Sequence, residues 1–115
     1  MSEMSAYLED GYTEEATIPG VAGLHPPCTF KFRPALPEER YEFQRIEDVS
    51  GAMRAKRTVK VIAQHVVAWD LMRRDKPADI KDEEGLKRLR PALLTKMLDY
   101  IMGYTPVQAG ADAGN

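Results

Sequence analysis

Apolar and polar positions alternate strictly in the stretch CTFKFR, which is the clearest pattern in the chain. Cys28, Phe30 and Phe32 share one side of it, and polar residues separate them. A period of two residues is typical of a half-buried β-strand. Residues 12–18 form a second candidate strand, and the Gly- and Pro-rich residues 19–27 would join the two as an antiparallel hairpin. Because a lone hairpin is marginal in water, helices or another chain should cover its Phe30/Phe32 face.

After Pro34 the period changes from that of a strand to that of a helix. Proline near a helix start, acids in the first turn, and Ser or Asp caps mark where each helix begins. The expected helical segments are residues 37–49, with Tyr41, Phe43, Ile46 and Val49 on the buried side; about 52–72, capped by Ser50 and stopped by Pro77; a short turn capped by Asp82; and a final helix from Pro91 to the stop at Gly103.

These elements predict one domain of the α+β class, mainly α, over residues 12–103. It would consist of an N-terminal β-hairpin or extended segment followed by a three- to four-helix domain. Residues 1–11 are expected to be a flexible acidic N-terminus, and residues 104–115 a flexible C-terminal tail. No stretch approaches the roughly 20 apolar residues of a membrane span, and the acidic N-terminus does not resemble a signal peptide. The expected location is the cytoplasm.

The two longest expected helices carry more apolar surface than a single core stripe requires. On a helical wheel the central one places Val59, Ile62, Ala63, Val66, Val67 and Trp69 in an arc about 160° wide, and leaves Leu71 and Met72 outside it. The final helix spreads its apolar residues over about half of its circumference. Core packing is the preferred interpretation of both stripes. The alternative is a partner-binding surface, whose candidate residues are Trp69, Leu94, Met97, Ile101 and Met102.

Few residues offer catalytic or metal-binding chemistry. His65 lies on the shoulder of the central stripe, and its spacing from Asp70 is not the i, i+4 spacing of a helical metal site. His25 and Cys28 would need two further metal ligands that the sequence does not clearly supply, and a lone cysteine is usually a small core residue. No glycine-rich phosphate loop or nucleophile elbow is found. We therefore expect no catalytic residues, no metal, no cofactor and no enzymatic activity.

Charge is distributed unevenly, although the formal net charge is only −2. Residues 1–30 hold five acidic residues and no Lys or Arg, so the remainder holds all 16 basic residues. Two basic clusters, residues 54–60 and 87–90, could contact phosphates if they met on one face. The basic excess is too small for a nucleic-acid footprint, so the preferred interpretation of both clusters is a solvated helix face.

A series of features follows the strand in a fixed order: a helix ending in V-x-x-W, a polar connector with proline and acids, and an amphipathic final helix. Its members are Val66, Val67, Ala68, Trp69 and Asp70; then Pro77, Ile80 and Asp82–Glu84; then Leu86, Leu89, Leu94, Met97 and Ile101. Over residues 28–103 this order resembles the tail assembly chaperones of long-tailed bacteriophages and their prophage-derived relatives. The connector reads RRDKP, without the glycine turn that often precedes the proline in that family.

The resemblance implies a non-enzymatic role in the cytoplasm of an infected bacterial host. Such a chaperone binds and solubilises the tape-measure protein, helps to recruit tail-tube subunits, and uses helix-in-groove contacts. Formation of a homo-oligomer stays open. Two alternatives also stay open: a structural head–tail or tail component, in which the strand pair would join a ring, and a small nucleic-acid-binding regulator that uses residues 54–60 and 87–90.

Overall fold

The computed structural model describes residues 6–45 and 50–107. Part of each expected flexible end, and the expected buried positions Ile46 and Val49, lie outside the described residues. Within them, no helix is both long enough and apolar enough to cross a membrane.

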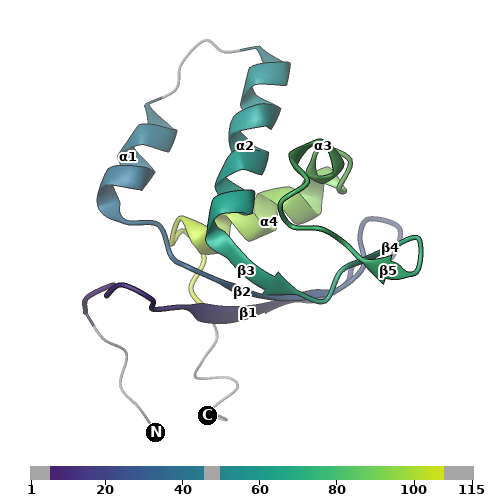
Figure 1. The fold of residues 1–115 in the computed structure, drawn as a ribbon, viewed down its shortest axis with the longest axis horizontal. Helices are drawn as coiled ribbons and strands as arrows, with labels where there is room; N and C mark the ends of the chain where they lie inside the picture. Colours follow the sequence, from purple (N-terminus) through teal and green to yellow (C-terminus); the bar gives the residue numbers. More distant parts are fainter. Residues whose placement is uncertain (1–5, 46–49, 108–115) are drawn as a thin grey trace, which may run out of the picture.

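A three-stranded antiparallel sheet forms the base of the fold, in the order β1-β2-β3. Its strands are β1 (Glu14–Ile18), β2 (Cys28–Phe32) and β3 (Val66–Trp69). Ala16 lies opposite Phe30 in the expected hairpin, and Phe30 lies opposite Trp69 on the other side of β2. The pairing of β1 with β2 confirms the predicted hairpin. Helices pack on one face of this sheet, as Figure 1 shows.

Four helices follow or interrupt the strands: α1 (Pro37–Gln44), α2 (Gly51–His65), α3 (Glu83–Leu86) and α4 (Pro91–Ile101). The starts of α2 and α3 confirm the predicted caps. The Ser50 side chain accepts a hydrogen bond from the Met53 amide at 3.2 Å, and the Asp82 side chain accepts one from the Gly85 amide at 3.1 Å. These bonds satisfy backbone donors that a helix start otherwise leaves without partners.

The prediction of a mainly α fold is wrong, because the second half of the chain mixes strands with helices. The central helix ends at His65 rather than near residue 72, and the chain becomes extended at Val66, where φ is −79° and ψ is 127°. Residues 66–69 form β3, and a separate hairpin follows as β4 (Met72–Arg73) and β5 (Lys76–Pro77). β-Branched Val66 and Val67 suit a strand at least as well as a helix, and pairing with β2 decides between the two.

The core lies between the sheet and helices α2 and α4. Phe30 and Phe32 have ring centroids 5.1 Å apart, and Tyr100 meets the Phe30 ring edge-on at 6.0 Å. The sheet and both helices contribute the other fully buried large side chains. These are Ile18 and Cys28 from the sheet, Val59 and Ile62 from α2, and Leu93, Met97, Ile101 and Met102 from α4 and its end. Helices thus cover the Phe30/Phe32 face, as expected for a hairpin that folds within one chain.

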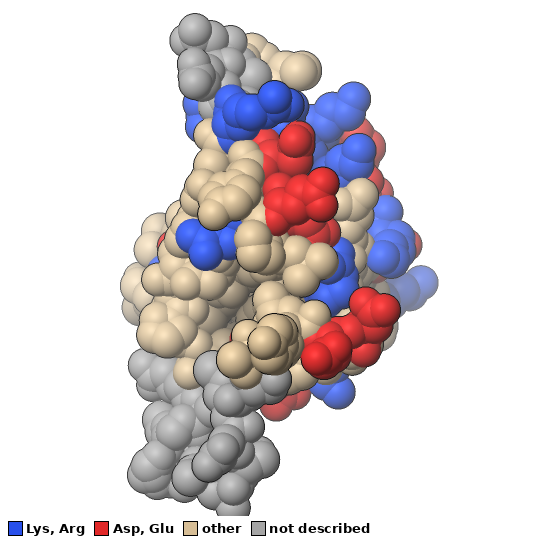
Figure 2. All heavy atoms as spheres, turned by 90° about the vertical axis from the view of Figure 1, so that its left-hand side faces the viewer, with Lys and Arg blue, Asp and Glu red and all other residues tan. Residues whose placement is uncertain are grey.

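Helix α1 stands at the edge of this core and buries none of its residues. Tyr41, which the sequence pattern placed on a buried side, is 67% exposed, and Phe43 is half-buried. On the face of the molecule that Figure 2 presents, acidic and basic side chains alternate rather than forming a patch of one sign.

The turn between β4 and β5 places Arg74 at φ 54° and Asp75 at φ 65°. Two-residue hairpin turns favour this left-handed conformation at both positions, and Asn-Gly is the sequence that adopts it at least cost. Other residues are sterically disfavoured there. The hairpin thus keeps the shape of a glycine turn without a glycine.

We predict that Arg74→Asn combined with Asp75→Gly raises the free energy of unfolding by about 1 kcal/mol, because both residues then adopt φ > 0 more easily. Urea denaturation followed by circular dichroism measures this as a higher midpoint at unchanged slope. Gly23 supplies the opposite control, since its φ is +77° and no neighbouring atom lies within 4 Å of the position that a Cβ would take. Gly23→Ala should lower the midpoint. A double variant with a lower midpoint than the parent would contradict the prediction.

Candidate partner-binding site

Trp69, at the end of β3, organises the candidate site. Its indole Nε1 donates a hydrogen bond to the Ala78 carbonyl oxygen at 2.9 Å. The Ala78 amide in turn donates to the Leu71 carbonyl oxygen at 3.0 Å. These two bonds join the chain before the β4–β5 hairpin to the chain after it. The tryptophan therefore fixes where the chain leaves the sheet and where it returns towards α3.

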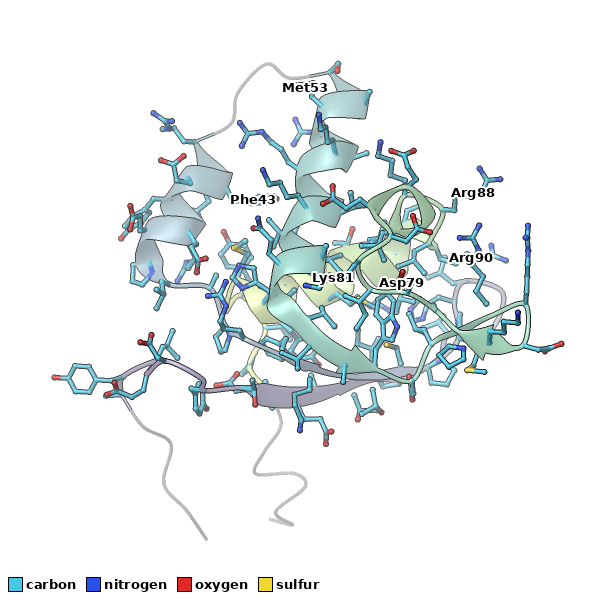
Figure 3. The ribbon with its side chains drawn as sticks, viewed as in Figure 1. Phe43, Met53, Asp79, Lys81, Arg88 and Arg90 are labelled. Atoms are coloured by element: carbon cyan, nitrogen blue, oxygen red, sulfur yellow. The ribbon has the colours of Figure 1, made fainter. Side chains whose placement is uncertain are left out.

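A cavity of about 210 Å³ opens between this hairpin and helices α3 and α4. Its walls are mostly apolar, and Met72, which is 60% exposed, stands beside it. Figure 3 shows Asp79, Arg88 and Arg90 on this side of the molecule, whereas Phe43 and Met53 lie on the opposite side and at the far end of α2. The lining residues are Trp69, Leu71, Met72, Ala78, Leu86, Leu89 and Leu93, together with Pro26, Gly85 and the charged residues around the opening.

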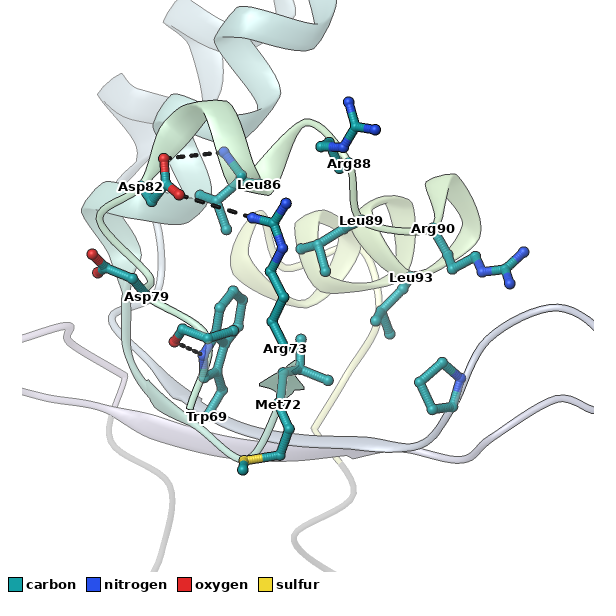
Figure 4. Close-up of a pocket in the computed structure, with 14 residues that line it drawn as sticks. Trp69, Met72, Arg73, Asp79, Asp82, Leu86, Arg88, Leu89, Arg90 and Leu93 are labelled. Atoms are coloured by element: carbon teal, nitrogen blue, oxygen red, sulfur yellow. Dashed lines mark hydrogen bonds and ion pairs between the residues drawn. The ribbon is translucent and has the colours of Figure 1, made fainter. Parts of the chain in front are cut away.

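Charged side chains surround the opening of the cavity with a definite polarity. Figure 4 places Asp79 and Asp82 on one side and Arg88 and Arg90 on the other, with Arg73 between them. The Arg73 guanidinium lies 4.0 Å from the Asp82 carboxylate, and both side chains are nearly half exposed. An ion pair so exposed contributes little to stability, so the arginines here stay available to a ligand.

The residues predicted for partner binding do not share one surface. Trp69 lines the cavity and is half-buried. Leu94 is half-buried and packs against the core, but it is not among the residues that line the cavity. Met97, Ile101 and Met102 are at most 1% exposed, so contact with a partner through them would require the core to open.

Sequence reasoning missed Met72, Arg73 and Leu89 as members of one site. The signal that could have revealed the hairpin is the stretch RRDKP, which the sequence pattern assigned to a polar connector after the central helix. A two-residue turn at Arg74 and Asp75 would have placed Arg73 opposite Lys76 and Met72 opposite Pro77, as observed. The distance in sequence between this hairpin and Leu89 hides their proximity from any local pattern.

His65 belongs to a separate cluster that ties α1 to the end of α2. The ring is 2% exposed, and its Nδ1 donates to the Arg33 carbonyl oxygen at 2.7 Å. Its Nε2 lies 3.3 Å from the Arg33 guanidinium and 3.4 Å from the Glu39 carboxylate. Arg33 also donates two hydrogen bonds to Glu39, at 3.2 and 3.1 Å, and the Leu36 amide donates a third at 2.8 Å.

Burial lowers the pKa of His65 below its ordinary value, and the neighbouring Arg33 charge acts in the same direction. For Glu39, burial opposes ionisation, but the hydrogen bonds from Arg33 and Leu36 outweigh it and lower the pKa of the carboxyl. The cluster is therefore held by a neutral imidazole and an ionised carboxylate. Its exposed opening is a hollow of about 320 Å³ between α1 and α2.

The remaining reactive groups are held in structural contacts. Cys28 is fully buried, and burial together with the Asp70 carboxylate raises the pKa of its thiol to about 12, so it is not a nucleophile at neutral pH. His25 accepts a hydrogen bond from the Lys96 amine at 2.8 Å. Among the described residues, no group of three or more His, Cys, Asp or Glu could hold a metal ion.

We predict that Trp69→Phe lowers the free energy of unfolding by about 1–2 kcal/mol, because the Ala78 carbonyl oxygen loses its donor while the aromatic packing is largely kept. Urea denaturation measures the change. Tyr41→Phe, which removes the hydroxyl of an exposed ring, is the control and should change the value by less than about 0.5 kcal/mol. If both substitutions change the free energy of unfolding by the same amount, the indole N–H does not have the structural role assigned to it.

We also predict that stability falls as the pH is lowered from about 7 to 5. Since the folded-state pKa of His65 is lowered, the unfolded chain binds a proton at a pH where the folded chain does not, and acid favours unfolding. Glu39 adds to this only at lower pH, in and below the ordinary carboxyl range, because its folded-state pKa is also lowered. Denaturant unfolding at several pH values gives the free energy of unfolding as a function of pH, and in this window it should fall less steeply for His65→Gln than for the parent chain. An equally steep fall in both chains would assign the pH dependence to other groups.

Comparison with known proteins adds no relative. No protein-family model matches the chain, and neither a curated protein nor a solved structure matches it. The likeness to tail assembly chaperones thus stays an inference from the motif residues. The candidate site is defined by the residues and geometry of this chain alone.

Proposed function

We propose that this chain is a non-enzymatic assembly chaperone of the phage-tail type, which binds a helical segment of a tape-measure protein at the cavity beside Trp69. By the same resemblance it would act in the host cytoplasm and help to recruit tail-tube subunits. The observation that carries the proposal is an open cavity with apolar walls, next to an exposed methionine. Flexible Met side chains adapt well to different protein partners.

The size of the cavity favours a protein partner over a small-molecule ligand. Pockets for drug-sized ligands usually span about 300–1,000 Å³, whereas this cavity measures about 210 Å³. A cavity of that size suits the insertion of one or two apolar side chains from a partner surface. Such buried anchors typically supply most of the binding energy of a protein–protein interface.

The motif residues on which the family resemblance depends support the same location. Trp69, Asp82, Leu86 and Leu89 are distributed over 21 positions of the sequence, yet all four line the cavity. Asp82 acts there as the cap of α3, and Leu86 forms the floor that is continuous with the core. These motif residues would then belong to one partner-binding cavity, which is enclosed by a tryptophan, a hairpin and a capped helical turn.

We predict that Met72→Glu weakens binding to the tape-measure protein about tenfold or more, because a carboxylate would have to be desolvated at an apolar contact. Met53→Glu is the matched control: Met53 is 49% exposed and lies at the far end of α2 (Figure 3). The measurement is the soluble fraction of the tape-measure protein on co-expression with each variant. Equal solubilisation by both variants would exclude the cavity, and no solubilisation by the parent chain would overturn the proposed function.

A further inference from the structure

We propose that the acidic segment, residues 1–13, of one copy of this chain docks on the arginine-flanked cavity of a second copy. The contact would insert apolar side chains of the segment between the β4–β5 hairpin and α4. Its acidic residues would pair with Arg88 and Arg90. The chain would thus cover its own exposed apolar site by self-association until another partner displaces the segment.

The cavity contributes unpaired positive charge beside apolar walls. Within residues 6–45 and 50–107, the side chains of Arg88 and Arg90 have no hydrogen-bond or ion-pair partner, and both are exposed. Figure 4 shows their guanidinium groups extending outward from the side of the cavity opposite Asp79 and Asp82. A ligand for this side should therefore be apolar in its centre and acidic at its flank.

The acidic segment has that chemistry. It contains Glu3, Glu9 and Asp10 and no Lys or Arg, and it carries the apolar residues Met4 and Leu8. In its described part, Glu9 and Asp10 are exposed, and Leu8 is 37% exposed. No other stretch of comparable length in the chain combines as many acids with apolar residues while lacking every basic residue, apart from those that overlap it.

The register of the sheet places the described part of the segment, residues 6–13, away from the cavity of its own chain. Glu14, where the segment joins β1, lies opposite Phe32, whereas Ile18 at the other end lies opposite Cys28. Pro26, which lines the cavity, is close to the Cys28 end. Residues 6–13 and the cavity therefore lie towards opposite ends of the sheet, as Figure 1 also shows. A second copy can present its segment to the cavity without this constraint.

A contact between two different surfaces of identical chains is heterologous, so an assembly that does not close by reciprocal exchange or as a ring keeps a free segment and a free cavity at its ends. Self-association should therefore rise with concentration, and an open assembly should grow beyond a dimer. Exposed ion pairs contribute little each and are screened by salt. The arginines and acids would mainly select the register of the contact, and the inserted apolar side chains would supply its affinity.

The test is sedimentation velocity of the full chain over a range of concentrations, at low and at high salt. The cavity variant carries Arg88→Glu and Arg90→Glu, and the segment variant carries Glu9→Lys and Asp10→Lys. We expect each to lower the association constant about tenfold or more, since two attractive pairs become repulsive. Arg54→Glu with Lys56→Glu reverses the same number of charges on the exposed start of α2 and should leave association unchanged.

Mixing the two variants in equal amounts is the decisive arm. The unchanged segment of the cavity variant then faces the unchanged cavity of the segment variant, and the two reversed surfaces face each other. Recovery of association in the mixture, but in neither variant alone, is the expected result. A chain that stays monomeric at every concentration overturns the proposal, as does association that all variants share or that mixing fails to restore. Circular dichroism of each variant checks that a loss of association is not a loss of folding.

Self-association is measured with this chain alone, so it stands or falls independently of tape-measure binding. If the charge-reversed pair reassociates while the parent chain does not solubilise the tape-measure protein, the self-contact holds and the proposed function fails. If the chain is monomeric but the tape-measure protein depends on Met72, the reverse is true.

Discussion

The pairing of β3 with β2 is the constraint on which the rest of the structure depends. α2 ends at His65 and β3 begins at the next residue, so no loop lets the helix shift independently of the strand. Backbone bonds extend the pairing at both ends: the Arg33 amide donates to the His65 carbonyl oxygen at 2.8 Å, and the Asp70 amide donates to that of Thr29 at 3.2 Å. This ladder fixes α2 over the sheet and sets the direction in which Trp69 points.

The candidate site follows from that direction. Trp69 binds the returning chain at Ala78, and Lys81 then donates a hydrogen bond from its amine to the Ala63 carbonyl oxygen at 2.7 Å. This bond satisfies one of the carbonyl groups that the end of α2 leaves without a helical partner. The connector is thus attached to both the strand and the helix, and α3 and α4 form the remaining walls of the cavity. Its shape is set by elements that the core already holds in place.

One cavity is assigned two occupants, and the balance between them has a simple physical form. An apolar opening left uncovered favours nonspecific association, so a weak contact with a second copy would protect it. A helical partner with better anchors would then displace the segment by mass action. The same cavity can hold both occupants with different affinities. Charge selects the self-contact, which is weak and depends on salt, whereas a larger buried apolar area makes the binding of a helical partner tighter.

The sequence by itself determined the N-terminal hairpin, the caps at Ser50 and Asp82 and the start of the last helix at Pro91, because each depends on residues close together in the chain. Only the tertiary structure decided that Val66–Trp69 is a strand. That apolar run fits either period, and the open edge of β2 supplied the backbone partners that made the extended form more stable. The burial of Met97, Ile101 and Met102 agrees with core packing, the interpretation that the apolar stripe of the last helix favoured. Only tertiary packing assembled the cavity, because its walls come from segments distant in sequence that no local pattern of residues connects.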